Sequence, residues 1–304
     1  MTWRLSGIES FEMRDAMLSL ARSILALAQL LTILATPDWQ MFMSVPSTSL
    51  AAQCTGIKAA SLWCVTGGEQ LPDPAGRTIA TVVLLLVLSG YRPRWSCIPH
   101  WYVAFSIAED VTTIDGGDHV AEIFTMLLIP ICLGDERVWI WRKPVYPVAP
   151  TWRGAAFAGY YLIRFQAAFI YLSAALSKLA HPAWRHATAL RSLLDNPSYG
   201  APALLRPLAE KVLSAPILAA PLTWGVIAIE LSIAASTALP RRQRRVGLLL
   251  VILLHGAIIL LMGLFSFGLI MIALMMAVNA GTSAVAMAPT YSPTHERAEG
   301  IASR

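Results

Sequence analysis

The chain has 304 residues, of which 23 are Lys or Arg and 18 are Asp or Glu, so its formal net charge is +5. Only 13% of the residues are charged and 56% are hydrophobic, whereas a soluble domain carries about a quarter charged residues. This composition excludes an ordinary soluble domain. The 19 Gly and 19 Pro follow no repeat, which disfavours disordered, collagen-like and solenoid chains. We therefore expect one all-α integral membrane domain, a polytopic helical bundle.

Apolar runs that could cross a bilayer, which needs roughly 20 residues per helix, follow one another along the chain. The first, from Ala16 to Ala35, comes after Arg4 and Arg14 and is followed by TPDWQ rather than by a small-residue cleavage site, which predicts a signal anchor and first span. The last run is too long for one crossing and predicts a break near Gly263 to Gly268. The sequence thus predicts about seven or eight transmembrane segments, at residues 16–36, 77–91, 97–111, 119–134, 154–180, 216–239 and 246–278, the last divided in two.

Basic clusters set the expected orientation, because Lys and Arg gather in cytoplasmic loops. If the segment 1–15 is cytoplasmic or at the inner interface, the clusters at 92–94, 137–153 and 241–245 all lie on the cytoplasmic side. The transmembrane domain is then 16–280, with outer loops at 37–76, 112–118 and 181–215 and a polar tail at 281–304.

The segment 202–214 alternates Leu with Arg206, Glu210 and Lys211 and predicts a helix. This helix either lies in the outer interface or is an ordinary solvated loop helix. The bilayer is the first expected partner. Nucleic acid is not expected, because no basic patch is interleaved with aromatic residues.

The cysteines give a separate prediction from the same topology. Cys54 and Cys64 fall in the first outer loop, whereas Cys97 and Cys132 fall near the inner ends of their spans. Because the outer side is oxidising, we expect a Cys54–Cys64 disulfide and two free thiols. Such a bridge would stabilise its short loop by about 2 to 3 kcal/mol. The absence of CxxC spacing favours this structural role over redox catalysis.

Ionisable side chains inside the predicted spans are candidate functional residues, because each costs at least about 2.5 to 3.5 kcal/mol to insert. Five stand out: Arg22, Arg164, Lys178, Glu230 and His255. Arg164, Tyr171 and Lys178 recur at seven-residue spacing, which places them on one helical face that must look into the bundle. Lys178 is near the outer end of its span, so snorkelling to the interface is an open alternative to a functional role.

Glu230 needs a cationic partner or a proton if it is buried, and an interhelical pair with Arg164 or Arg22 is the expected arrangement. His255 is open to three interpretations: a core histidine, a proton carrier or a ligand. No HExxH, CxxC or paired-His spacing accompanies it, so a metal site is not expected. A further histidine, His119, lies in the turn IDGGDHVAEIF at the outer end of the fourth span.

Four segments between residues 116 and 278 resemble a known family, the horizontally transferred transmembrane domain, which vitamin K-dependent gamma-carboxylases share with bacterial sporulation-delaying protein B. They are GGDHVAEIFTMLLIP, LIRFQAAFIYLSAALSKLAHPAWRHATAL, TWGVIAIELSIAAS and RRVGLLLVILLHGAIILLMGLFSFGLIMIALMM. The second is the most specific. It carries at the family's spacing Gln166, Tyr171, Lys178 and Trp184, in order with His119 and His255.

In the carboxylases, a lysine and a histidine together deprotonate reduced vitamin K, and oxygen then yields a very strong base. The resemblance implies that Lys178 is this base and that His119 assists it. It also implies a pocket for a reduced quinone of the vitamin K or menaquinone type, used with oxygen and without a metal. Its expected lining residues are His255, Tyr171, Gln166 and Arg164, with Glu230 and Arg22 as structural polar residues.

The carboxylases carry a large extramembrane domain for which this chain has no length left, so the chain is more similar to the sporulation-delaying protein B group. Members of that group work with a small membrane-associated A protein to mature a secreted peptide toxin. The resemblance therefore implies a maturase in the bacterial inner membrane that acts on a secreted precursor at the outer face. The alternative is a non-enzymatic membrane protein that exports, chaperones or gives immunity to a peptide.

Overall fold

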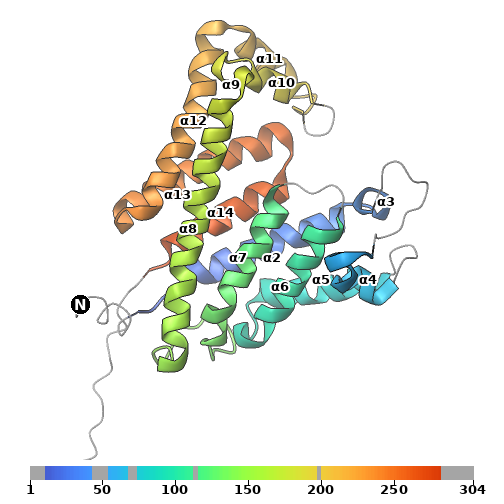
Figure 1. The fold of residues 1–304 in the computed structure, drawn as a ribbon, viewed down its shortest axis with the longest axis vertical. Helices are drawn as coiled ribbons and strands as arrows, with labels where there is room; N and C mark the ends of the chain where they lie inside the picture. The colour runs from blue at the N-terminus through green and yellow to red at the C-terminus, as the bar shows by residue number, and fades with distance from the viewer. Residues whose placement is uncertain (1–10, 43–53, 68–73, 112–115, 197–199, 282–304) are drawn as a thin grey trace, which may run out of the picture.

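The computed structural model of the chain describes all residues except 1–10, 43–53, 68–73, 112–115, 197–199 and 282–304 (Figure 1). The part that it describes is built of helices and contains no strand beyond an isolated bridge between Tyr91 and Trp139. The predicted all-α class is confirmed.

Eight long helices follow the predicted apolar runs within the described ranges. They are α2 Ala16–Ala35, α5 Pro74–Ser89, α6 Pro93–Asp110, α7 Gly116–Leu133, α8 Pro150–Ala180, α12 Pro216–Ala238, α13 Arg241–Met262 and α14 Phe265–Asn279. The shorter elements are α3 Asp38–Met41, the 3₁₀ helix η1 Gly56–Ala60, α4 Leu62–Gly67, α9 Pro182–Arg185, α10 Ala189–Leu194 and α11 Arg206–Ser214.

Five of these helices, α2, α7, α8, α12 and α13, are long and apolar enough to cross a membrane. Two more, α5 and α14, are apolar but have only 16 and 15 residues. Large apolar side chains also lie on the outside of the bundle. Phe165 of α8 and Leu260 of α13 are each 67% exposed, as expected of side chains that face lipid. The polytopic membrane class is therefore confirmed, and crossings by α5, α6 and α14 stay predictions.

The predicted break in the last apolar run is confirmed at Gly263. Helix α13 ends at Met262, Gly263 adopts a left-handed backbone with φ of +70°, and α14 begins at Phe265. Because α14 then returns along α13, the two helices pack against each other instead of continuing in one direction. This turn brings the start of α14 next to His255 of α13.

The start of α2 is tied to the end of α14. Asp15 caps α2, because one of its carboxylate oxygens accepts a hydrogen bond from the backbone N–H of Leu18 at 2.9 Å. The other oxygen accepts from the N–H of Gly281, just after α14, at 2.7 Å. Residues 11–14 fold inward beside this cap, and Phe11 stacks edge-on against Phe157 of α8 at 5.3 Å. The N-terminal and C-terminal helices thus form one packed unit.

Helices α8 and α12 stand side by side and carry α9, α10 and α11 at their shared end (Figure 1). Helices α7 and α14 pack against α8, and α13 packs between α12 and α14. One core lies around α2, α7, α8 and α14, and a second lies around α2, α5 and α6. The 31 residues of α8 span about 46 Å, more than the roughly 30 Å of the hydrocarbon layer. The helix α11 confirms that the segment 202–214 contains a helix.

Two of the predicted loops are shorter than the sequence suggested. Helix α5 begins at Pro74 and α7 at Gly116, so residues 74–76 and 116–118 are helical instead of loop. The rest of the second predicted outer loop, 112–115, and the tail from residue 282 lie outside the described residues.

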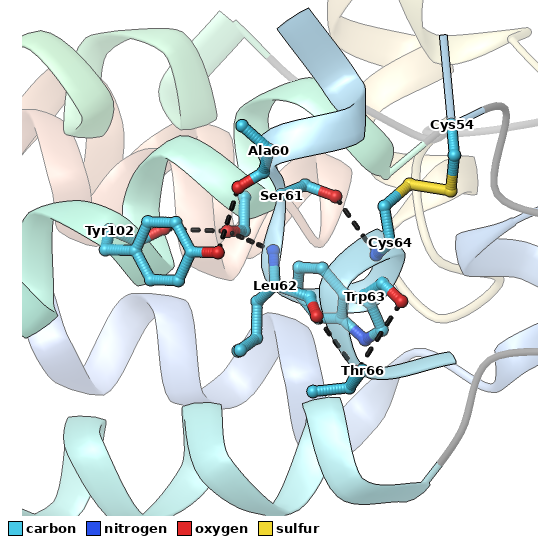
Figure 2. The surroundings of a disulfide bond; sticks show 9 residues. Cys54, Ala60, Ser61, Leu62, Trp63, Cys64, Thr66 and Tyr102 are labelled. Carbon is cyan, nitrogen blue, oxygen red and sulfur yellow. Dashed lines mark hydrogen bonds between the residues drawn. A yellow bond between two sulfur atoms is a disulfide. The ribbon is translucent and has the colours of Figure 1, made fainter. Parts of the chain in front are cut away.

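The predicted disulfide is confirmed. Cys54 and Cys64 are bonded, with their Cα atoms 5.6 Å apart, and Figure 2 shows the bridge beside the turn that joins η1 to α4. Ser61 lies in this turn, and its hydroxyl accepts from the N–H of Cys64 at 3.3 Å. The hydroxyl of Tyr102 on α6 donates to the carbonyl of Ala60 at 2.9 Å, which fixes the bridged segment onto α6. The thiols of Cys97 and Cys132 are free, as predicted, and both are buried.

Candidate functional site

An ion pair joins α8 to α12 near the end that carries α9. Lys178 Nζ lies 2.7 Å from Glu230 Oε1, and the side chain of Glu230 is only 8% exposed. The ring of Trp184 in α9 covers the ammonium group, with its centroid 5.2 Å from Nζ. Trp184 can take this position because His181 ends α8 and caps α9, which turns the chain back over the lysine. The charge is therefore held by a carboxylate and an aromatic face at once.

A second polar contact lies below the first. Tyr171 stands two helical turns before Lys178 on the same face of α8, and its hydroxyl lies 3.0 Å from Nε2 of His255 on α13. The ring of Phe267 from α14 packs against the imidazole, with centroids 5.1 Å apart. Two buried polar atoms at these contacts, His255 Nδ1 and Glu230 Oε2, have no hydrogen-bond partner in the described part of the chain. Free polar atoms beside a cavity are available to a ligand.

These side chains line one cavity of about 350 Å³ between α8, α12, α13 and the start of α14. Its polar lining consists of Tyr171, Lys178, Glu230 and His255, and the rest is apolar or aromatic. An apolar groove of about 390 Å³ lies next to it, between α10 and α11 on one side and α12 and α13 on the other. The two spaces share the lining residues Leu190, Leu193, Val226, Leu254, Ile258 and Met262. Together they form a space with a polar end and an apolar end, which suits an amphiphilic ligand.

His119 does not meet Lys178 at this cavity. Gln166 of α8 donates to the carbonyl of Val120 at 3.0 Å, so His119 lies near the level of Gln166 along α8. Lys178 follows twelve residues later, about 18 Å farther along the helix axis. His119 is exposed, and its imidazole lies 3.8 Å from Glu122 on its own helix. The expected pairing of base and assistant is therefore corrected: α8 extends well past the start of α7.

Arg164 and Gln166 also lie away from the cavity. Gln166 binds Val120 as described, and Arg164 donates both Nε and Nη2 to the carbonyl of Thr237 on α12. The guanidinium group of Arg164 stacks on the ring of Tyr161 at 5.2 Å. Neither side chain is among those that line the cavity.

The partner expected for Glu230 was wrong. We expected Arg164 or Arg22, but Arg164 is level with Thr237, two helical turns from Glu230 on α12. Arg22 is buried elsewhere, where its Nη2 donates to the hydroxyl of Ser96 on α6 at 2.8 Å. Lys178 reaches Glu230 instead because its long, flexible stem follows α8 toward α12.

The structure adds polar contacts that the sequence did not single out. His100 of α6 is buried, and its Nε2 lies 2.8 Å from Oε1 of Gln29 on α2. Both residues interrupt apolar runs, which is the signal that could have identified them. Two aromatic residues also line the cavity: Trp184, which the sequence resemblance included, and Phe267, which no sequence signal indicated.

The arrangement supports two kinds of chemistry. Lys178 and Glu230 share a hydrogen bond, so the amine can accept a proton only after the pair has separated or the ammonium has passed its proton to Glu230. Tyr171 and His255 offer a hydroxyl and an imidazole to the same cavity, and these can bind a ligand hydroxyl or carbonyl. The same contacts can equally serve as polar packing between α8, α12 and α13.

Comparison with known proteins finds two relatives of this chain in Bacillus subtilis (strain 168). It is 31% identical over 256 residues to sporulation-delaying protein SdpB of Bacillus subtilis (strain 168), which covers 84% of this chain and 78% of SdpB. It is also 30% identical over 253 residues to Uncharacterized protein YitO of the same strain, which covers 83% of this chain and 81% of YitO. No family model matches the chain, and no solved structure does.

Proposed function

The chain belongs to the family of sporulation-delaying protein SdpB, and we propose that it is a membrane-embedded maturase of a secreted peptide precursor. The observation that carries this proposal is the cavity in which Lys178, Glu230, Tyr171 and His255 meet inside an otherwise apolar bundle. Burying four such side chains together is costly, and intramembrane ionisable residues of this kind mark functional sites. The proposed location is the bacterial inner membrane, with the cavity toward the outer face and a small A-type protein as partner.

The proposal retains a reduced quinone as cofactor, on the resemblance to the carboxylases. The residues present fit such a group: His255 Nδ1 and Glu230 Oε2 are unpaired polar atoms, and the neighbouring groove has only apolar lining residues. When bound, a reduced quinone with oxygen would supply the strong base. His255 and Tyr171 would orient its polar ring, and the groove between α11 and α13 would hold its chain and keep water away.

In this proposal Lys178 is the proton acceptor and Glu230 is its positioning partner. The ammonium lies 2.7 Å from Glu230 Oε1, so Glu230 can take the lysine proton before the amine acts. His119, Gln166 and Arg164 are left out of the proposed site, because the structure does not bring them to this cavity.

The test is the mass change of the precursor in cells that express the native operon, compared among variants at equal membrane levels. Lys178→Arg keeps a cation beside Glu230 but provides no base, and we expect it to slow maturation roughly a hundredfold or more. Lys178→Glu combined with Glu230→Lys restores an ion pair with reversed positions, and we expect the same loss. Lys211→Arg on exposed α11 is the matched control and should mature the precursor normally.

One observation favours a second candidate function, a non-enzymatic protein for export, chaperoning or immunity. The Lys178–Glu230 pair itself is the contact that a scaffold would use to hold α8 to α12. This candidate predicts that Lys178→Ala fails, whereas Lys178→Arg and the charge-exchanged double variant keep normal function, because each preserves the pair. The same experiment therefore decides between the two functions.

A further inference from the structure

A separate pocket lies at the opposite end of α8 from the cavity, where the loop 134–149 joins α7 to α8. It has a volume of about 350 Å³ and is lined mainly by this loop, by Trp152 of α8 and by Arg14 from the segment before α2. In Figure 1 the end of α7 and the start of α8 lie together at the lower end of the molecule. The pocket shares no lining residue with the proposed maturation site.

Two guanidinium groups build the walls of this pocket. Arg137 binds Asp135 through Nε and Nη2 and donates from Nη1 to the carbonyls of Ile140 and Arg142 at 2.6 and 2.8 Å. Arg14 binds Glu12 in the same two-pronged way and donates to the carbonyl of Tyr146 at 2.6 Å. Because both arginines are nearly buried and fully paired, they fix the shape of the loop.

Two other cations in the lining are not used in this way. Arg142 and Lys143 are exposed, and the structure gives their side chains no hydrogen bond or ion pair within the described ranges. The carboxylate that also lines the pocket, Glu136, is held by Arg94 at 3.1 Å. Each acidic group here thus has its own arginine, and the two unpaired cations leave the pocket with an excess positive charge. A pocket with this excess binds an anion.

The surroundings of the pocket identify the source of the anion. Val145 is 79% exposed and Tyr146 77% exposed, and Trp139 and Trp141 also present their rings outward. Exposed aromatic and apolar side chains at helix ends, next to Lys and Arg, are typical of the level of lipid headgroups. A free phosphate or an acidic soluble partner would have no use for these apolar neighbours.

We infer that this pocket binds the phosphate headgroup of an anionic phospholipid, with Arg142 and Lys143 contacting the phosphate and the exposed rings of Trp139, Trp141 and Tyr146 seated among neighbouring lipids. Basic pockets between membrane helices on the cytoplasmic side bind anionic headgroups such as that of cardiolipin. The inference rests on the loop alone and does not depend on the proposed maturation chemistry.

The test uses the full chain in nanodiscs of phosphatidylcholine with increasing phosphatidylglycerol, and bound lipid is counted by native mass spectrometry. Each basic side chain near an anionic headgroup contributes about a fivefold gain in affinity, so Arg142→Gln with Lys143→Gln should weaken phosphatidylglycerol binding about 25-fold. The matched control is Arg242→Gln with Arg245→Gln. It removes two exposed cations from the basic run at the start of α13, outside the pocket. We expect it to change binding less than about threefold.

Several outcomes would overturn the inference. Equal weakening in both double variants would mean that only the overall charge attracts the lipid. Displacement of the lipid by millimolar glycerol 3-phosphate would mean that the pocket takes a soluble phosphate. Unchanged phosphatidylglycerol binding in the pocket variant would exclude the site. The melting temperature of both variants in pure phosphatidylcholine checks that the loop still folds, and we expect it to equal that of the unaltered chain.

Discussion

Two glycines of α13 show how single residues control packing in this bundle. A Cβ atom built on Gly247 would lie 2.0 Å from the hydroxyl of Ser236 on α12 and 2.8 Å from the terminal methyl carbon of Met275 on α14. Gly256, nine residues later on the same helix, has open space at the corresponding position. Gly247 therefore allows three helices to meet, whereas Gly256 makes no such contact.

We predict that Gly247→Val destabilises the protein by about 1 to 3 kcal/mol, because it overpacks a close helix contact. Gly256→Ala is the control and should leave stability unchanged or slightly raised, since alanine favours helix. The measurement is the melting temperature in detergent, followed with a thiol-reactive dye. The free, buried Cys97 and Cys132 react only when the bundle opens. Equal melting temperatures for the two variants would contradict this account of α13.

The site residues show what the sequence could and could not predict at this scale. Seven-residue spacing predicted that Arg164, Tyr171 and Lys178 share one face, and only Tyr171 and Lys178 line the cavity. Glu230 and His255, singled out because ionisable residues are rare in a span, line the same cavity, and their functional role stays a prediction. The pairing of Glu230 with Lys178 was not predictable, because it depends on the axial offset between α8 and α12, which the sequence does not give. A second unknown offset, that of α8 along α7, misled the expectation for His119, which lies about 18 Å short of Lys178 along α8.

At the scale of helices, the turn between α13 and α14 decides where His255 meets Phe267. The turn requires a left-handed residue, and Gly263 supplies it with φ of +70°. Nothing lies within 4 Å of a Cβ built on this glycine, so a side chain there would meet backbone strain only. A substitution at Gly263 therefore tests the effect of backbone strain without adding a steric clash.

Replacing Gly263 should weaken the helical hairpin through this strain. We predict that Gly263→Ala lowers stability by about 1 to 2 kcal/mol, whereas Gly263→Asn loses less because asparagine tolerates the left-handed region. The thiol-dye melting assay measures both, with Gly256→Ala as the control for adding a methyl group to α13. A melting temperature for Gly263→Ala equal to that of the control would show that the turn does not need the left-handed conformation.

Element positions were largely predictable, because apolar runs of a given length have few alternatives in a bilayer. The predicted spans match α2, α7 and α12 within three residues at each end, and the break after Met262 was expected from length alone. The short helices α9, α10 and α11 were harder to predict, because they have four, six and nine residues, and only the α11 segment was predicted from its alternating pattern. The groove between these short helices and α12 and α13 therefore could not be predicted from the sequence.

For the whole molecule, orientation in the membrane is the property that connects both proposed sites. The predicted topology has the disulfide-bonded segment near Cys54 on the oxidising side and basic loops such as 134–149 on the cytoplasmic side. In this topology α8 crosses the bilayer from Pro150, next to the basic loop, to Ala180, next to α9. The same topology predicts that the proposed maturation cavity faces the outer side and the proposed phosphate pocket the inner side.

This orientation predicts opposite labelling at two exposed arginines. In intact cells, a membrane-impermeant maleimide should label Arg206→Cys on α11 but leave Arg142→Cys in the loop 134–149 unlabelled until the cells are permeabilised. Background should be low, because Cys97 and Cys132 are buried and Cys54 and Cys64 are bonded to each other. Labelling of Arg142→Cys but not of Arg206→Cys in intact cells would show that the chain has the opposite orientation in the membrane. The cavity around Lys178 would then face the cytoplasm, where a precursor meets the protein before secretion.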